Sequence, residues 1–347
     1  MIFAIILMVL LGFSLLFNLT QFIGGLSSYT VSHGRTSGPR LDEAVYEDND
    51  AADKIALIDV SGVITGGSMD QSGYSLPDLI KAQLKRAKDD DHVKGVILRV
   101  NSPGGEVLAA DEISRDIADF QKGAEGKPVV AQMGDLAASG GYYVSVPCRW
   151  IVANQMTLTG SIGVIMDSFN YRSLMDKVGV SPVVYKSGRF KDMLSGSRST
   201  NEIPPEEHKL VQDLIDEVYA KFKSVVQTGR DAAHDENKKA SSTADQGRAL
   251  SPSWKEYADG RVLSGTQALE LGFVDELGDF QDAVKRTQKL AGITNANLII
   301  YEERRDLSDL FRLFGKSQAP TLKVDIGLDF PKLKGGQLYY LAPTFVN

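Results

Sequence analysis

The chain has 347 residues, of which 43% are hydrophobic and 24% are charged, and its net charge is −7. This length and composition exclude a disordered or fibrous protein and allow one large or two small globular domains. The acidic charge argues against nucleic acid as a partner, while the single cysteine, Cys148, excludes disulfide frameworks and multi-thiolate metal clusters. No two of the four histidines have the short spacing of a zinc motif. We therefore expect no metal and no cofactor.

Residues 1–26 are predicted to form a transmembrane anchor. No charged residue or histidine occurs before His33, and a helix over residues 2–25 would extend about 36 Å, against about 30 Å of hydrocarbon core. The alternative, a cleaved signal peptide, normally has a basic start and a shorter apolar stretch. Arg35 and Arg40 follow the span, and by the positive-inside rule they favour a cytoplasmic body. The polar residues 27–53 are predicted to be a linker.

The segment 54–301 is predicted to be an α/β domain with a mostly parallel sheet, because short β-branched runs alternate with helical spacing. Apolar residues at helical spacing predict one helix between residues 76 and 87 and another between 107 and 120. A long amphipathic helix begins at Pro204, and its apolar stripe from Val211 to Val225 is expected to lie in the core. The predicted strands are residues 55–60, 95–100, 128–133, 150–153 and 182–185.

Two later segments are predicted to lie outside this pattern. Residues 231–253 are polar and indicate a surface insertion, and residues 302–347 indicate a C-terminal tail. Within the tail, residues 338–341 are a candidate for adding a strand to a neighbour.

Two glycine-rich turns that follow predicted strands are the candidate sites for chemistry, since such turns expose backbone N–H groups. The first is residues 101–105, and the second is residues 135–143, where small residues flank Ser139. A tight strand-to-helix turn would place the Ser139 hydroxyl beside the N–H of Gly140, as a nucleophile beside an oxyanion donor. A close helix–sheet contact and a phosphate cradle are the alternatives, although neither segment ends like a P-loop.

A serine nucleophile needs a base, and the sequence offers two. Among the histidines, only His208 lies near an apolar stripe. A lysine whose pKa falls from about 10.4 toward about 7 to 8 on burial could serve instead, and Lys191 in the short loop 187–192 fits. The residues therefore leave open a Ser–Lys hydrolase, a Ser–His hydrolase using His208, and a non-catalytic membrane scaffold.

Five motifs, in order along the chain, resemble the short form of the signal peptide peptidase A (protease IV) family. They are residues 101–105, residues 137–143, residues 159–164, residues 187–192, and a closing signature formed by residues 259–262 and 272–278. The resemblance covers residues 54–301 and the anchor. It implies a ClpP/crotonase-like fold with repeated β-β-α units, preceded by one transmembrane helix. It further implies a membrane-anchored serine endopeptidase with a Ser/Lys dyad that degrades remnant signal peptides and other apolar peptides.

Carried over residue by residue, the resemblance makes Ser139 the nucleophile and Lys191 the general base. Ser161 would position the lysine, and the N–H groups of Gly105 and Gly140 would form the oxyanion hole. The family also implies a homo-oligomer whose active sites lie at protomer interfaces, on a single-pass protein of the cytoplasmic membrane with its catalytic body outside. The polar segment 231–253 is longer than the family pattern.

Overall fold

The computed structural model describes residues 38–67, 74–124, 126–303 and 338–341, together with Leu11 and Ser14. Apart from those two residues, the expected anchor lies outside the described part. None of the described helices is both long and apolar enough to cross a membrane. The chain divides into two units, and residues 43–302 with 330–347 make up the larger one. The described part of the smaller unit is limited to Leu11, Ser14, residues 38–42 and Glu303.

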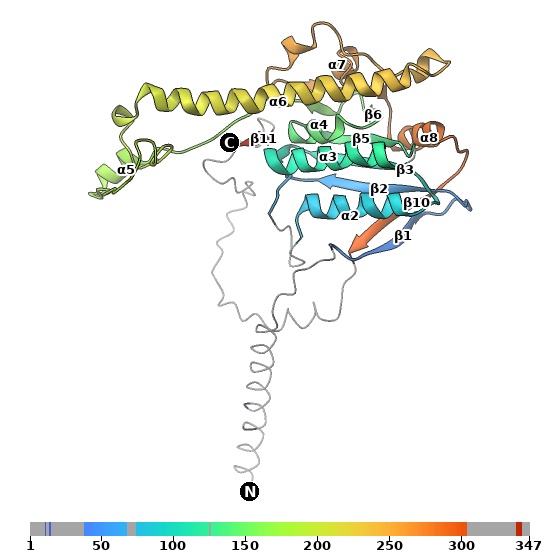
Figure 1. Ribbon diagram of the computed structural model, residues 1–347, viewed down its shortest axis with the longest axis horizontal. Helices are drawn as coiled ribbons and strands as arrows, with labels where there is room; N and C mark the ends of the chain where they lie inside the picture. Colours follow the sequence, from blue (N-terminus) through green and yellow to red (C-terminus); the bar gives the residue numbers. More distant parts are fainter. Residues whose placement is uncertain are drawn as a thin grey trace. The chain divides into compact units, whose positions relative to one another are not determined.

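A mostly parallel sheet forms the centre of the larger unit, as the alternating pattern predicts (Figure 1). Its main path runs in the order β1-β10-β2-β3-β5-β6-β9, while β7 pairs in parallel with β5 and antiparallel with β8. The strands are β1 (Leu41–Glu47), β2 (Lys54–Ser61), β3 (Val93–Ser102), β5 (Val129–Ala138), β6 (Trp150–Ala153), β7 (Leu158–Gly160), β8 (Val262–Ser264), β9 (Glu276–Leu277) and β10 (Asn297–Glu303). A separate two-stranded ladder joins β4 (Gly104–Glu106) to β11 (Tyr339–Leu341).

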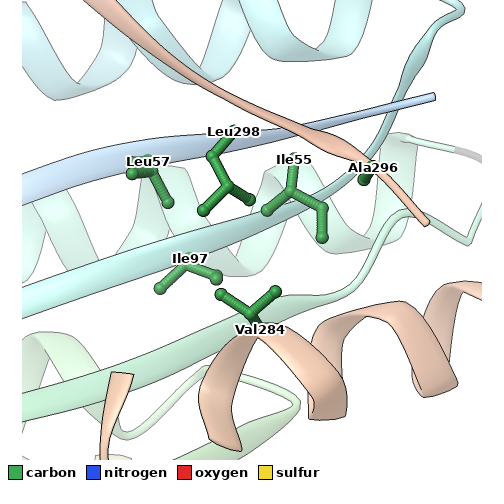
Figure 2. Packing of buried hydrophobic residues seen from close by; sticks show 6 residues of the cluster. All are labelled: Ile55, Leu57, Ile97, Val284, Ala296 and Leu298. Atoms are coloured by element: carbon green, nitrogen blue, oxygen red, sulfur yellow. The ribbon is translucent and has the colours of Figure 1, made fainter. Parts of the chain in front are cut away.

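The helices cover both faces of this sheet, and the middle of β2 and β3 is accordingly buried on both sides. Helices α2 (Leu76–Asp89) and α3 (Val107–Gly123) pack against each other, and α8 (Phe280–Ala291) packs on β3 and β5. Figure 2 shows side chains of β2, β3 and β10 meeting α8 in one apolar cluster. The buried members of that cluster are Ile55, Leu57, Ile97, Val284, Ala296 and Leu298.

Local signals in the sequence fix the ends of these helices. Ser75 caps α2 in a capping box with Asp78, and Asp279 caps α8 in the same way. Helix α8 ends at Gly292, whose φ of 70° is the left-handed conformation that glycine adopts readily. The shorter elements are α4 (Gly140–Ser145), α5 (Arg172–Lys177), α7 (Gly265–Glu270), and the 3₁₀ turns η1 (Thr200–Glu202), η2 (Thr243–Asp245) and η3 (Trp254–Tyr257).

The long helix α6 (Pro205–Asn237) has two halves with different surroundings. Its 33 residues span about 50 Å at ~1.5 Å per residue. The C-terminal half is buried against the body through side chains that include Phe222 and Val226, whereas Leu210 and Leu214 in the N-terminal half are exposed. Figure 1 shows α6 crossing α4 and continuing to the segment that carries α5. The stripe expected in the core is therefore core only in part.

Three expectations about the chain's organisation are corrected. The predicted strand 182–185 is irregular, because no strand among the described residues pairs with it, and Tyr185 is 94% exposed. The expected linker 27–53 contains β1, an edge strand that is mostly exposed and whose sequence shows no alternation of apolar and polar residues. The expected insertion 231–253 begins as helix, since α6 continues to Asn237, and that buried side chain binds Arg149.

Candidate active site

Ser139 lies in the sharp turn between β5 and α4. Its φ of 55° and ψ of −116° are unusual for a residue with a side chain, and such strain clusters at functional sites. The Ser139 N–H donates to the carbonyl of Gly160 at 2.8 Å, and the Ser139 carbonyl accepts from Tyr143 at 2.8 Å. The side chain is buried, and within the described residues its hydroxyl has no hydrogen-bond partner. The described part of the fold thus holds a buried hydroxyl in a sharp turn with its hydrogen-bonding capacity unused.

The backbones of β4 and α4 meet beside this serine. A Cβ added to Gly140 would lie 3.1 Å from the Gly105 nitrogen, and one added to Gly104 would lie 2.6 Å from the Gly140 nitrogen. Gly104 also has φ +101°, which only glycine adopts without strain. Its N–H donates to the buried Ser102 hydroxyl at 3.1 Å. The close approach needs glycine, and it brings the backbone nitrogens of Gly105 and Gly140 together next to Ser139.

Ser161 follows β7 just as Ser139 follows the neighbouring strand β5. Ala138 and Gly160 are partners in the parallel ladder, so the two serines come directly after paired residues. Ser161 is buried, has φ 50°, and donates its N–H to the carbonyl of Arg261 at 2.8 Å. The structure therefore groups four of the five predicted site residues: Ser139, Ser161, Gly105 and Gly140.

The first part of the closing signature supports Ser161. The Asp259 carboxylate accepts two hydrogen bonds from the Arg261 guanidinium, at 2.8 and 2.6 Å. Mainly through these bonds, Arg261 lowers the pKa of Asp259 to about 2. This pair holds the turn that presents the Arg261 carbonyl to Ser161.

The second part of the signature, residues 272–278, connects helices α4 and α6 to the sheet through hydrogen bonds and an ion pair. The Phe273 carbonyl accepts from the Tyr142 hydroxyl of α4 at 3.1 Å. Asp275 receives the Arg230 guanidinium of α6 at 2.5 Å, and both side chains are fully buried. Asp275 also accepts from the backbone of Ile151 and Arg248, at 2.9 and 3.0 Å. Sequence reasoning missed Arg230, although an arginine four residues after Val226 on an apolar stripe signals a buried charge pair.

Lys191 lies on an exposed loop near the beginning of α6. Ion pairs of the same loop region, Arg189–Glu206 at 2.6 Å and Arg198–Glu207 at 2.7 Å, tie it to the first turn of that helix. The ring of Tyr143, four residues after Ser139, instead packs on Phe222 of α6. Fifteen residues separate Glu207 from Phe222, which is about 22 Å of helix at ~1.5 Å per residue. Within one chain, the structure does not bring Lys191 to Ser139.

His208, the other candidate base, lies at the same end of α6 as the loop of Lys191. His208 is exposed and follows Glu207 directly in the first turn of α6, so it too is about four helical turns from Phe222. The single chain therefore brings neither candidate base to the serine. Among the described residues, no group of three or more His, Cys, Asp or Glu side chains could hold a metal ion.

Comparison with known proteins identifies relatives over most of the chain. The family model of peptidase family S49 matches residues 121–251 and 242–294. A candidate signal peptide peptidase SppA of Enterococcus faecium is 37% identical over 266 residues, which cover 76% of this chain and 71% of that protein. A candidate protease of Synechocystis is 38% identical over 279 residues, covering 79% and 88%. Protease 4 of Salmonella typhi is 33% identical over 75% of this chain but only 38% of its own length.

Proposed function

The chain belongs to peptidase family S49 and is a serine peptidase related to signal peptide peptidase A, and on that premise we propose that it works with a Ser139/Lys191 dyad. One observation carries the assignment of the nucleophile. The buried Ser139 hydroxyl is without a partner among the described residues, and it sits in a strained turn beside the backbone nitrogens of Gly105 and Gly140. A hydroxyl beside paired backbone donors suits acyl transfer.

In the proposed reaction, neutral Lys191 takes the proton of the Ser139 hydroxyl as its oxygen attacks the peptide carbonyl. The oxyanion of the tetrahedral intermediate accepts hydrogen bonds from the N–H groups of Gly105 and Gly140. The leaving amine then takes a proton from the lysine, and water resolves the acyl-enzyme. Ser161, next to the Ser139 turn, would position the lysine amine. Losing one oxyanion donor typically lowers turnover by about 10² to 10³.

The proposed base comes from a second copy of the chain. The loop that carries Lys191 is tied to the first turn of α6 by the Arg198–Glu207 ion pair. Glu207 in that turn is about 22 Å along the helix from Phe222, which packs on Tyr143 near Ser139, and this length is beyond the reach of a lysine side chain. The segment around it exposes large apolar side chains, among them Phe169 at 81% and Tyr185 at 94%. Such a surface favours contact with another protein surface. We therefore propose a homo-oligomer in which one copy's Lys191 serves its neighbour's Ser139, head to tail as in a closed ring.

The substrates we propose are extended apolar peptides, with remnant signal peptides as the natural class. The relative of Enterococcus faecium, by its name a candidate signal peptide peptidase, supports this class. Residues 1–26 would anchor the chain in the cytoplasmic membrane by a single span, with the catalytic body on its outer side. The α/β sheet would be a ClpP/crotonase-like fold of β-β-α units. The apolar run at the N-terminus and the nucleophile turn support these assignments.

The test is peptidase activity of the purified full chain together with labelling by a serine-reactive acylating probe. Ser139→Ala should abolish both labelling and cleavage of apolar peptides, while the circular dichroism spectrum stays unchanged. Lys191→Ala should abolish cleavage, whereas His208→Ala should retain it. Retained cleavage in Lys191→Ala would reject the dyad, and no labelling of the wild-type chain would favour the scaffold.

A further inference from the structure

Ser102, the last residue of β3, carries a buried hydroxyl that the proposed reaction does not use. The residue is 0% exposed, and it pairs with Ala137 of β5, two residues before Ser139. The register of the β3–β5 ladder shifts between Val100 and Ser102, so the chain leaves the regular sheet at this point. The Ser102 hydroxyl accepts a hydrogen bond from the N–H of Gly104 at 3.1 Å. It therefore lies where β3 turns into the glycine-rich segment.

Two hydrogen bonds hold the peptide groups on either side of Gly104. Its N–H donates to the Ser102 hydroxyl, and its carbonyl accepts from the Ile64 N–H at 2.8 Å. Because a peptide group is planar and trans, the N–H of Gly105 points away from the carbonyl of Gly104. Holding Gly104 on both sides therefore fixes the direction of the Gly105 N–H, which is one of the two proposed oxyanion donors.

The same serine also lies against the turn that carries the second donor. A Cβ added to Gly141 would lie 2.6 Å from the Ser102 carbonyl oxygen and 3.3 Å from the Ser102 Cβ. Gly104 needs outside support, because its φ is +101° and a glycine has no side chain to restrict its backbone. Ser102 is thus packed between the segment of Gly105 and the segment of Gly140.

We propose that Ser102 is a positioning residue of the oxyanion hole, whose hydroxyl holds the turn that aims the Gly105 N–H. This inference rests on the proposed peptidase function and adds a residue to its machinery. Without the hydroxyl, one of the two hydrogen bonds that hold Gly104 is lost, and the Gly105 donor loses its fixed direction. An oxyanion donor acts in the transition state, so the loss falls on kcat and leaves KM unchanged.

The test measures kcat and KM of three full-chain variants on one apolar peptide. Ser102→Ala removes the acceptor of the Gly104 N–H, and Ser102→Cys keeps a weak acceptor at the same place. Ser145→Ala is the matched control, since it removes another serine hydroxyl that is 0% exposed and donates to the Gly141 carbonyl at 2.9 Å. We expect Ser102→Ala to lower kcat about tenfold to 10²-fold while KM changes less than about twofold. Ser102→Cys should have an intermediate kcat, and Ser145→Ala should keep the wild-type value.

Two binding measurements separate positioning from a general loss of structure. A peptide boronic acid forms a tetrahedral adduct with Ser139 and so places an oxygen where the oxyanion develops. Its affinity should fall in Ser102→Ala by the same factor as kcat. The uncleaved peptide should bind equally well to Ser139→Ala chains with and without Ser102→Ala, because bound substrate carries no oxyanion.

The outcomes that would overturn the inference are distinct from those that would overturn the proposed function. A wild-type kcat in Ser102→Ala, a change confined to KM, or an equal loss of kcat in Ser145→Ala would overturn the positioning role alone. A kcat in Ser102→Cys below that of Ser102→Ala would do the same, since a partial acceptor should recover part of the rate. A wild-type chain that cleaves no peptide would overturn the proposed function and this inference with it.

Discussion

Replacing Asp275 by alanine should destabilise the protein more than replacing its partner Arg230 by methionine. Asp275→Ala leaves a guanidinium that is 0% exposed without its counter-charge, which costs about 3–5 kcal/mol. It also removes the acceptor of the Ile151 and Arg248 N–H groups, at about 1–3 kcal/mol each. Since coupled losses do not add fully, we expect a loss of about 5 kcal/mol or more.

Arg230→Met leaves fewer buried polar groups without a partner than Asp275→Ala does. The Asp275 carboxylate keeps its two backbone donors, and the methionine side chain fills most of the space of the arginine stem. The expected cost is about 3 kcal/mol, at the lower end for a broken buried pair. The assay is urea denaturation of the full chain in one detergent at fixed protein concentration, followed by tryptophan fluorescence. If Arg230→Met lowers the free energy of unfolding as much as Asp275→Ala or more, the reasoning is refuted, because the hydrogen bonds from the Ile151 and Arg248 N–H groups to Asp275 would then contribute nothing.

Two further predictions concern the site itself. Gly104→Ala should lower the rate of Ser139 acylation by about 10² or more, because the added Cβ would lie 2.6 Å from the Gly140 nitrogen. The control is Gly179→Ala, which also has a positive φ but open space around it and should not lower that rate. Similar acylation rates in the two variants would contradict the role assigned to the close approach of Gly104 and Gly140. Arg261→Gln should raise the pKa of Asp259 from about 2 toward about 3.9, measured by NMR titration of the carboxyl group. The lowered pKa stabilises the wild type above about pH 4, and that stabilisation is lost as the pH falls toward 2, so an unshifted pKa in the variant would show that Arg261 is not its cause.

The central strands and the serine turn were predictable because their signals are local. Residues 55–60 and 95–100 are runs of β-branched side chains that lie buried on both sides of a sheet, and β2 and β3 contain them. The small residues around Ser139 indicate a tight strand-to-helix turn, and the structure has one between β5 and α4. Neither inference needs knowledge of distant parts of the chain.

The errors arise where distant partners decide the structure. Residues 182–185 have the composition of a strand, but none of the strands that the structure describes pairs with them, and they are irregular and mostly exposed. Residues 41–47 have the composition of a linker, yet pairing with β10 makes them an edge strand. The place of β11 on β4 was equally hidden, because 34 residues outside the described part, 304–337, lie between it and β10. The loop of Lys191 could be recognised by its motif, but its position depends on α6, because an ion pair ties the loop region to the first turn of that helix.

Mixing two inactive variants tests the central claim most directly. Full chains with Ser139→Ala and full chains with Lys191→Ala are combined in equal amounts under conditions in which subunits demonstrably exchange. If each site takes its serine from one copy and its lysine from another, one half of the serines meets one half of the lysines, so roughly a quarter of wild-type activity should return. If both residues act within one chain, every chain lacks one of them, and the mixture would stay inactive.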